Sequence, residues 1–88
     1  MTPDARKLCD SVSEWIEQSL RQGEFFGVFF EIDESLGRCD RYVTFKFKSE
    51  LIIKTRRFCA DPIEKGLISE SRLRLEAWDL LGRLRGLA

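Results

Sequence analysis

The amino-acid sequence, 88 residues long, contains no histidine. Nucleophiles activated by histidine are therefore excluded, as are histidine zinc sites and the usual switch at physiological pH. The two common glycine-rich phosphate loops, G-x-G-x-x-G and G-x-x-x-x-G-K, are also missing from the sequence. From these absences we expect no enzymatic activity and no bound cofactor.

Long apolar runs are missing as well, since no segment approaches the ~20 apolar residues that span a bilayer. The N-terminal stretch MTPDARKLCD lacks the apolar core of a signal peptide. We therefore expect a cytoplasmic protein with no membrane partner. A hydrophobic fraction of 43% and a charged fraction of 34% indicate a single compact domain over residues 1–88.

Cysteine is scarce, with Cys9, Cys39 and Cys59 far apart and no C-x-x-C pair. An odd number of cysteines without a secretion signal argues against a disulfide framework. We expect three small, buried apolar side chains, because free cysteine is among the most buried residue types. The alternative is a reactive thiol or an intermolecular disulfide.

The net charge is zero, but the two signs are separated along the chain. Residues 1–37 hold three basic and eight acidic side chains, whereas residues 38–58 hold seven basic and two acidic ones. A small protein polarised in this way orients in the field of another molecule. Acidic side chains gather around one predicted loop, but their spacing matches no EF-hand and we expect no metal site there: Glu31, Asp33, Glu34 and Asp40.

A helix is predicted over residues 3–22. Thr2 supplies a hydroxyl for the cap, and Pro3 occupies the first helical position. Apolar residues then recur at spacings of three and four, which places them on one stripe: Ala5, Leu8, Val12, Trp15, Ile16 and Leu20. Gly23 follows as a plausible end signal.

Two further helices are predicted after the strands. Asp61 and Pro62 begin a short one, which Gly66 ends after about one turn. Ser69 or Ser71 then caps a longer helix. Its buried stripe is Leu73, Ala77, Leu80, Leu81 and Leu84. Trp15 and Trp78 lie beside the stripes of the two long helices, which predicts packing between these helices; the alternative is an interface anchor.

Between the long helices lie three predicted strands, Glu24–Ile32, Arg38–Lys48 and Leu51–Phe58. In the first strand one face is wholly apolar, with Phe26, Val28, Phe30 and Ile32. Its other face carries Phe25, Gly27, Phe29 and Glu31 and is partly apolar. This composition favours a central strand or a dimer interface, and the alternative is an exposed aromatic patch that meets a partner.

The pairing of the second and third strands follows from which face is buried. A two-residue turn would place Phe45 opposite Lys54 and mix apolar with charged side chains on each face. A loop of odd length, such as Ser49-Glu50-Leu51, places Phe47 opposite Ile53 and Lys46 opposite Lys54. We therefore predict the odd loop or a bulge.

The predicted fold class is α+β, in the order α-β-β-β-α, with a three-stranded antiparallel sheet and the helices on one face. In outline this order resembles the double-stranded RNA-binding domain and the small Alu-binding subunits of the signal recognition particle. The Lys-Lys-x-Ala-Lys signature of the first family has no counterpart in Ala60-Asp61-Pro62-Ile63-Glu64-Lys65 or in Ser71-Arg72-Leu73-Arg74. The resemblance is therefore one of element order, and it transfers no binding residues.

The basic strands carry the main functional hypothesis. The odd loop would place Lys46, Lys48, Lys54 and Arg56 on one exposed face, interleaved with aromatic residues, as suits phosphate contacts and base stacking. The candidate binding residues are Lys46, Lys48, Lys54, Arg56, Arg41 and Arg57. The partner is RNA, DNA or an acidic protein surface, and a homodimer would double the patch.

The alternative hypothesis is a small protein-binding regulator, such as a phage- or virus-encoded inhibitor that docks on a larger host protein. The small size, the charge polarity and the lack of catalytic signatures all fit this reading.

Overall fold

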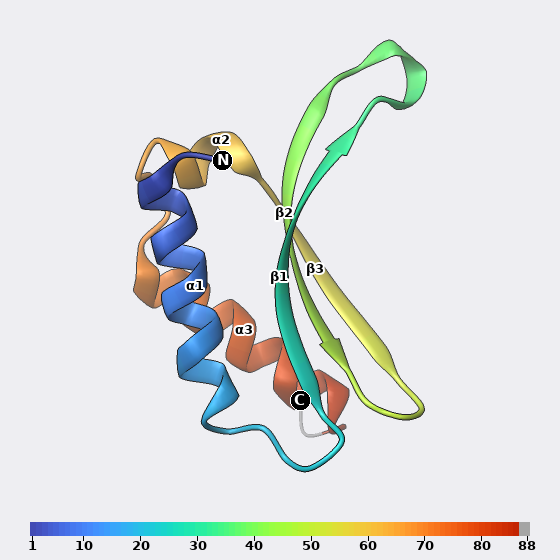
Figure 1. The fold of residues 1–88 in the computed structure, drawn as a ribbon. Coiled ribbons are helices and arrows are strands. Elements are labelled where there is room, and N and C mark those ends of the chain that lie inside the picture. Colours follow the sequence, from blue (N-terminus) through green and yellow to red (C-terminus); the bar gives the residue numbers. More distant parts are fainter. Residues whose placement is uncertain (87–88) are drawn as a thin grey trace.

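The computed structural model describes residues 1–86 and confirms the order α-β-β-β-α, with a short additional helix before the last one (Figure 1). The elements are α1 (Pro3–Glu17), β1 (Phe25–Asp33), the 3₁₀ turn η1 (Ser35–Gly37), β2 (Asp40–Lys48), β3 (Ile53–Cys59), α2 (Ala60–Glu64) and α3 (Glu70–Leu84). No helix within the described residues is long and apolar enough to cross a membrane.

Helix α1 begins as predicted but ends early. The Thr2 hydroxyl accepts a hydrogen bond from the Ala5 N–H at 3.3 Å, so the N-cap is confirmed. The helix stops at Glu17 rather than at residue 22. The N–H groups of Ser19 and Leu20 instead bond the carbonyls three residues earlier, and such bonds tighten and close a last turn.

The caps of the C-terminal helices are partly as predicted. Ser69 caps α3, since its hydroxyl accepts a hydrogen bond from the Arg72 N–H at 3.2 Å. Asp61 does not cap α2 but lies inside it, and its carboxylate binds Arg41 of β2 at 2.7 Å. The helix uses Cys59 as its N-cap residue, without a side-chain hydrogen bond.

The sheet is antiparallel in the order β1-β2-β3, so β2 is the central strand and β1 lies at an edge. The prediction of a central first strand is therefore wrong. Phe26, Val28 and Phe30 of β1 face the helices and lie opposite Phe47, Phe45 and Val43 of β2. Figure 1 shows the β1–β2 hairpin extending past the helices at its tip. Ile32, toward this tip, is 56% exposed although it lies on the apolar face, and Phe30, which lines a groove beside α1, is 36% exposed.

The register of β2 with β3 also differs from the predicted one. Phe47 lies opposite Lys54, Phe45 opposite Arg56 and Lys46 opposite Thr55. The connection is a four-residue loop, residues 49–52, closed by a hydrogen bond from the Ser49 N–H to the Ile52 carbonyl at 2.9 Å. An even loop therefore places charged residues of β3 on the same face as core residues of β2.

Both long helices cover one face of the sheet (Figure 1). Helix α1 packs against β1, and α3 packs against β2 and β3. Phe26, Phe45 and Phe47 contribute the largest buried rings, and the predicted stripe of α3 is confirmed as buried. The remaining core residues are Ala5, Cys9, Val12, Ile16, Val43, Ala60, Ile63, Leu73, Ala77, Leu80, Leu81 and Leu84.

All three cysteines are free, but they differ in environment. Cys9 is buried, as predicted, and burial raises the pKa of its thiol to about 11, which keeps it protonated and unreactive at neutral pH. Cys39 and Cys59 are exposed, so the prediction of three buried thiols is wrong for these two. Cys39 lies in the segment just before β2, and Cys59 is the last residue of the edge strand β3.

Candidate functional site

The face of the sheet turned away from the helices is not covered by any described element (Figure 1). Because side chains alternate along a strand, this face is the counterpart of the buried row Val43, Phe45 and Phe47. We call it the open face. It consists of Phe25, Gly27, Phe29, Glu31 and Asp33 from β1, Asp40, Tyr42, Thr44, Lys46 and Lys48 from β2, and Ile53, Thr55, Arg57 and Cys59 from β3.

Two phenylalanine rings dominate the β1 part of the open face. Phe25 is 52% exposed and Phe29 is 42% exposed, which is unusual for rings of this size. Both bend over Gly27, where an added Cβ atom would lie 2.9 Å from Cε2 of Phe29 and 3.0 Å from Cε1 of Phe25. The absence of a side chain at Gly27 therefore lets the two rings form one continuous aromatic patch.

Cationic side chains lie beside these rings. Lys46 is opposite Gly27 and Lys48 is opposite Phe25 in the β1–β2 pairing. The Nζ atom of Lys46 is 5.9 Å from the centre of the Phe29 ring, within the range of a cation–π contact. Aromatic rings and ammonium groups thus alternate over a short distance on one uncovered surface.

The middle of the open face is held by a polar network. The Thr44 hydroxyl donates a hydrogen bond to the Glu31 carboxylate at 2.9 Å, and Arg57 pairs with the same carboxylate at 3.4 Å. The guanidinium of Arg57 also stacks on the Tyr42 ring, 4.2 Å from its centre. Partial burial, with a smaller contribution from Asp40, raises the pKa of Tyr42. Arg57 is therefore largely occupied by contacts within the protein.

The charge of the open face changes sign along the strands. Lys46 and Lys48 lie toward the β2–β3 loop, whereas Asp33 and Asp40 pair at the hairpin end. A hydrogen bond from the Ser35 N–H to the Asp33 carboxylate lowers the pKa of this residue, which favours its charged form. The end near the β2–β3 loop is therefore the only part of the described open face where rings and unpaired cations coincide.

The six predicted binding residues do not share one face. Lys46, Lys48 and Arg57 lie on the open face, whereas Arg41, Lys54 and Arg56 lie on the face that carries the helices. The predicted row of like charges opposed across strands is therefore wrong. Lys46 lies opposite Thr55, and Arg57 lies opposite Thr44.

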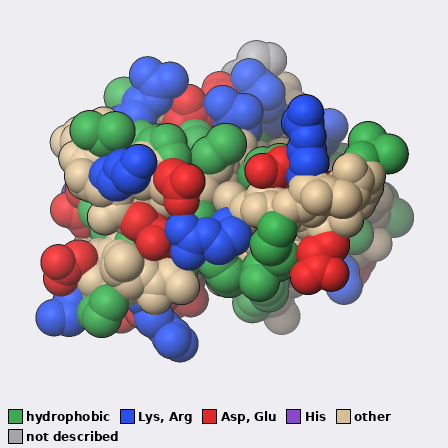
Figure 2. Space-filling model, turned by 90° about the horizontal axis from the view of Figure 1, so that it is seen from above, with side chains coloured by type: hydrophobic (Ala, Val, Ile, Leu, Met, Phe, Trp, Pro, Cys, Tyr) green, Lys and Arg blue, Asp and Glu red, His purple; other side chains and the backbone are tan. Residues whose placement is uncertain are grey.

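The two arginines on the helix side have structural partners. Arg41 donates a hydrogen bond to Asp61 at 2.7 Å and forms an ion pair with Glu64 at 2.9 Å, and the Asp61 hydrogen bond raises the pKa of the guanidinium. These contacts tie β2 to α2. Figure 2, which views the molecule from this end, shows basic and acidic side chains interspersed. Arg56 pairs with Glu76 of α3 at 3.3 Å.

The exposed rings were visible in the sequence only as one of two alternatives. The alternation of Phe25, Gly27, Phe29 and Glu31 was compatible with a second buried face or with an exposed patch. Both rings are exposed, so this face of β1 is an exposed aromatic patch and not a second buried face. The two alternatives differ in whether a second layer covers this face of the sheet, and no described element does. Layering depends on contacts between distant segments and not on local pattern.

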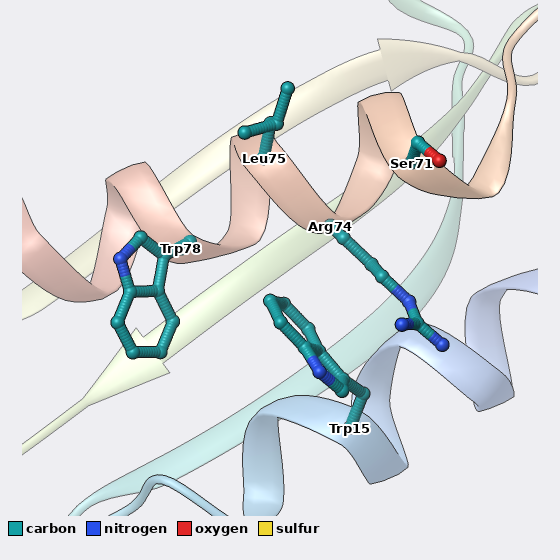
Figure 3. Close-up of a pocket in the computed structure, with 5 residues that line it drawn as sticks. All are labelled: Trp15, Ser71, Arg74, Leu75 and Trp78. Atoms are coloured by element: carbon teal, nitrogen blue, oxygen red, sulfur yellow. The ribbon is translucent and has the colours of Figure 1, made fainter.

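A second surface feature lies on the outer side of the helical layer. Figure 3 shows Trp15 of α1 and Trp78 of α3 side by side, with ring centres 5.9 Å apart. They line an open groove of about 520 Å³ together with Ser71, Arg74 and Leu75. Trp78 is 50% exposed and Leu75 is 67% exposed, so the predicted packing between the helices is confirmed but lies at the surface.

No metal centre is apparent in residues 1–86, where no three His, Cys, Asp or Glu side chains gather in a suitable arrangement. Comparison of the chain with protein-family models, with curated proteins and with solved structures found no match. The likeness to the double-stranded RNA-binding domain thus remains one of element order.

Proposed function

We propose that this protein is a non-enzymatic module that binds single-stranded nucleic acid, free or within a larger complex, through the open face. The observation that carries the proposal is the pair of exposed rings, Phe25 and Phe29, directly beside Lys46 and Lys48. Bases stack on aromatic rings and phosphates bind ammonium groups, and single-strand binding surfaces combine these two features.

The arrangement favours a single strand over a duplex. The rings of Phe25 and Phe29 lean toward each other over Gly27 and form one exposed aromatic patch. Such a patch can stack with the unpaired bases of a single strand, whereas a duplex hides the faces of its bases. Lys46 and Lys48 supply about two phosphate contacts, so we expect an affinity that falls with a slope of about −1.4 on a logarithmic salt scale.

The proposal is tested by fluorescence anisotropy with short labelled oligo(U) and oligo(dT) at low salt. Lys46→Glu should weaken binding about tenfold or more, because it puts a carboxylate beside the stacking site. The matched control is Lys54→Glu, which makes the same charge change on the opposite face, across from Phe47. Its effect should stay within about twofold, at the level of a distant surface charge.

The ring contribution needs its own variant. Phe29→Ala removes an exposed ring without touching the core and should cost about 1–3 kcal/mol of binding, the range of one stacked base. Absence of binding at low salt, or equal losses in Lys46→Glu and Lys54→Glu, would contradict the proposal.

A second candidate function, a protein-binding regulator, is favoured by the groove between Trp15 and Trp78. Exposed tryptophan is enriched at the energetic centre of protein interfaces. Arg74 stacks on Trp15, 5.0 Å from the ring centre, and already pairs with Glu70 at 3.4 Å. The groove therefore offers a partner mainly the aromatic and apolar surface of Trp15, Leu75 and Trp78. A stoichiometric partner that survives nuclease treatment and is lost in Leu75→Asp, but not in Lys46→Glu, would favour this function.

A further inference from the structure

The two edges of the sheet differ in how they end. Strand β1 pairs with β2 on one side only, and no hydrogen bond within residues 1–86 reaches its outward N–H and C=O groups. In an antiparallel strand, alternate residues point these groups away from the neighbouring strand. A row of unpaired backbone donors and acceptors therefore runs along the outer side of β1, which is nine residues long.

The usual features that block strand addition are missing from most of β1. Edge strands are commonly protected by lysine, proline, bulges or a covering element. The stretch Phe25–Phe30 contains no charge and no proline, and its pairing with β2 is unbroken. In contrast, β3 carries Lys54, Arg56 and Arg57 within seven residues. Only β3 has the composition of an edge that avoids further pairing.

Space for an added strand lies next to β1 on the helix side. A groove of about 310 Å³ separates this edge from α1 and is lined by Val28 and Phe30 of the strand. Its other walls are Met1, Arg6, Cys9 and Asp10. Side chains of an incoming strand that point toward the helices would enter this groove and cover the apolar wall.

We propose that the outer edge of β1 pairs antiparallel with β1 of a second copy, which forms a two-fold dimer with a continuous six-stranded sheet. An antiparallel self-pairing brings the apolar segments Phe26–Phe30 together, and Val28 and Phe30 of each copy meet the groove of the other. The pairing is complementary in charge as well. It places the acidic end of one β1, with Asp33, near the start of the other, where Arg21 is exposed.

The symmetry determines what the dimer presents. The two-fold axis of an antiparallel strand pair is perpendicular to the sheet, so both helical layers lie on one side. Both open faces then lie on the other side, and the rings of Phe25 and Phe29 from the two copies become neighbours. The proposed dimer depends on the free edge of β1 and not on the proposed function. It is tested without nucleic acid, so that the dimer and the nucleic-acid binding can be disproved independently of each other.

Sedimentation of the nucleic-acid-free protein over a range of concentrations provides the first test. The structure leads us to expect a monomer–dimer equilibrium that Phe30→Lys weakens about tenfold or more, because a charge enters the apolar seam. Phe30 is 36% exposed, so this variant leaves the core intact. Ile53→Lys makes the matched change on the β3 edge, where the residue is also exposed, and it should alter the equilibrium by less than about twofold.

Amide hydrogen exchange identifies the interface directly. The outward N–H groups of β1 should exchange more slowly as the dimer forms, whereas those on the outer side of β3 should not change. A monomer at every concentration overturns the proposal. So does a dimer whose outward β1 amides exchange as fast as in the monomer, or one that Phe30→Lys and Ile53→Lys weaken equally.

Discussion

The two outer strands of the sheet meet the same central strand in opposite ways. On the helix side, β1 sets apolar residues against β2, with Phe26 opposite Phe47 and Val28 opposite Phe45. Strand β3 places Lys54 and Arg56 opposite the same two phenylalanines. Strand β1 therefore extends the apolar core to its edge of the sheet, whereas at β3 charged residues form the boundary of the core.

The difference shows how a charged residue can occupy a core-facing position at an edge. The guanidinium of Arg56 stacks on Phe58, 4.9 Å from the ring centre, and reaches Glu76 of α3. Its aliphatic stem covers apolar surface while the charge stays at the rim. Strand β3 thereby gains charges that discourage pairing with a further strand. Strand β1 lacks such charges over most of its length, so its outer edge is not protected in this way.

The largest test of this contrast is Phe26→Ala in β1. Phe26 is 1% exposed, and its ring lies 4.5 Å from that of Phe47 and 5.7 Å from that of Phe45. Its removal should lower the free energy of unfolding by about 3–5 kcal/mol, measured by urea denaturation. Phe58→Ala is the matched change in β3 and should cost about 2 kcal/mol, because that ring is half-buried. Equal losses would show that the two strands contribute alike.

The second test concerns the entry to β1. Glu24 bonds Arg85 at 3.0 Å, Arg85 also donates to the Ser19 carbonyl, and both side chains are nearly buried. The Arg85 hydrogen bond lowers the pKa of Glu24 from 4.5 to about 2. Glu24→Gln should lower the free energy of unfolding at neutral pH by about 1–3 kcal/mol, the range of a charge-assisted hydrogen bond.

The pH dependence distinguishes this pair from simple packing. A carboxylate whose pKa is lowered by folding contributes its full stability above its unfolded pKa, and loses it as the pH falls through the folded one. The gap between the native protein and Glu24→Gln should therefore be constant above about pH 4.5 and close as the pH approaches about 2. A gap that does not depend on pH would contradict the assignment.

Local sequence features predicted the elements well. The caps at Thr2 and Ser69 and the buried stripe of α3 are confirmed because each depends on residues a few positions apart. The predicted register of β3 with β2 was wrong because the prediction required apolar residues to lie opposite apolar ones. That rule holds where a face is buried, as for β1, and fails at an edge where Arg56 reaches solvent and Glu76.

The candidate site shows the same limit. Its lysines were found from composition, but the register error placed Lys54 and Arg56 among them on one face. Phe25 and Phe29 are exposed because no described element covers the open face. The local pattern of β1 does not reveal this, since the layering of elements is set by contacts between distant segments. The alternation within each strand therefore predicted which residues share a face, whereas the way the strands assemble could not be predicted from the sequence.

The third test addresses the charged side of the comparison. Glu76 pairs with Arg56 at 3.3 Å and with Arg72 at 3.2 Å; its own side chain is 18% exposed, whereas that of Arg56 is 49% exposed. Arg56→Ala should lower the free energy of unfolding by only about 0.5–1 kcal/mol, the upper range for surface ion pairs. A double-mutant cycle with Glu76→Ala should give a coupling that shrinks in high salt. A loss as large as that of Phe58→Ala would instead make Arg56 part of the core.

The smallest expected change in stability comes from Gly27→Ala on the open face of β1. The added Cβ would lie 2.9 Å from Cε2 of Phe29, at the far end of an exposed side chain that can turn away. Alanine is also less unfavourable than glycine within a strand, so the free energy of unfolding should change by no more than about 0.5 kcal/mol.

The same substitution separates the two phenylalanine rings that lean over Gly27, while both rings remain in the protein. If stacking requires their continuous patch, Gly27→Ala should weaken oligo(U) binding by about threefold to tenfold at unchanged stability. Thr55→Ala, on the same face but across β2 from these rings, is the control and should leave the affinity unchanged. Unaltered binding by Gly27→Ala, together with a loss in Phe29→Ala, would mean that each ring stacks independently of the other.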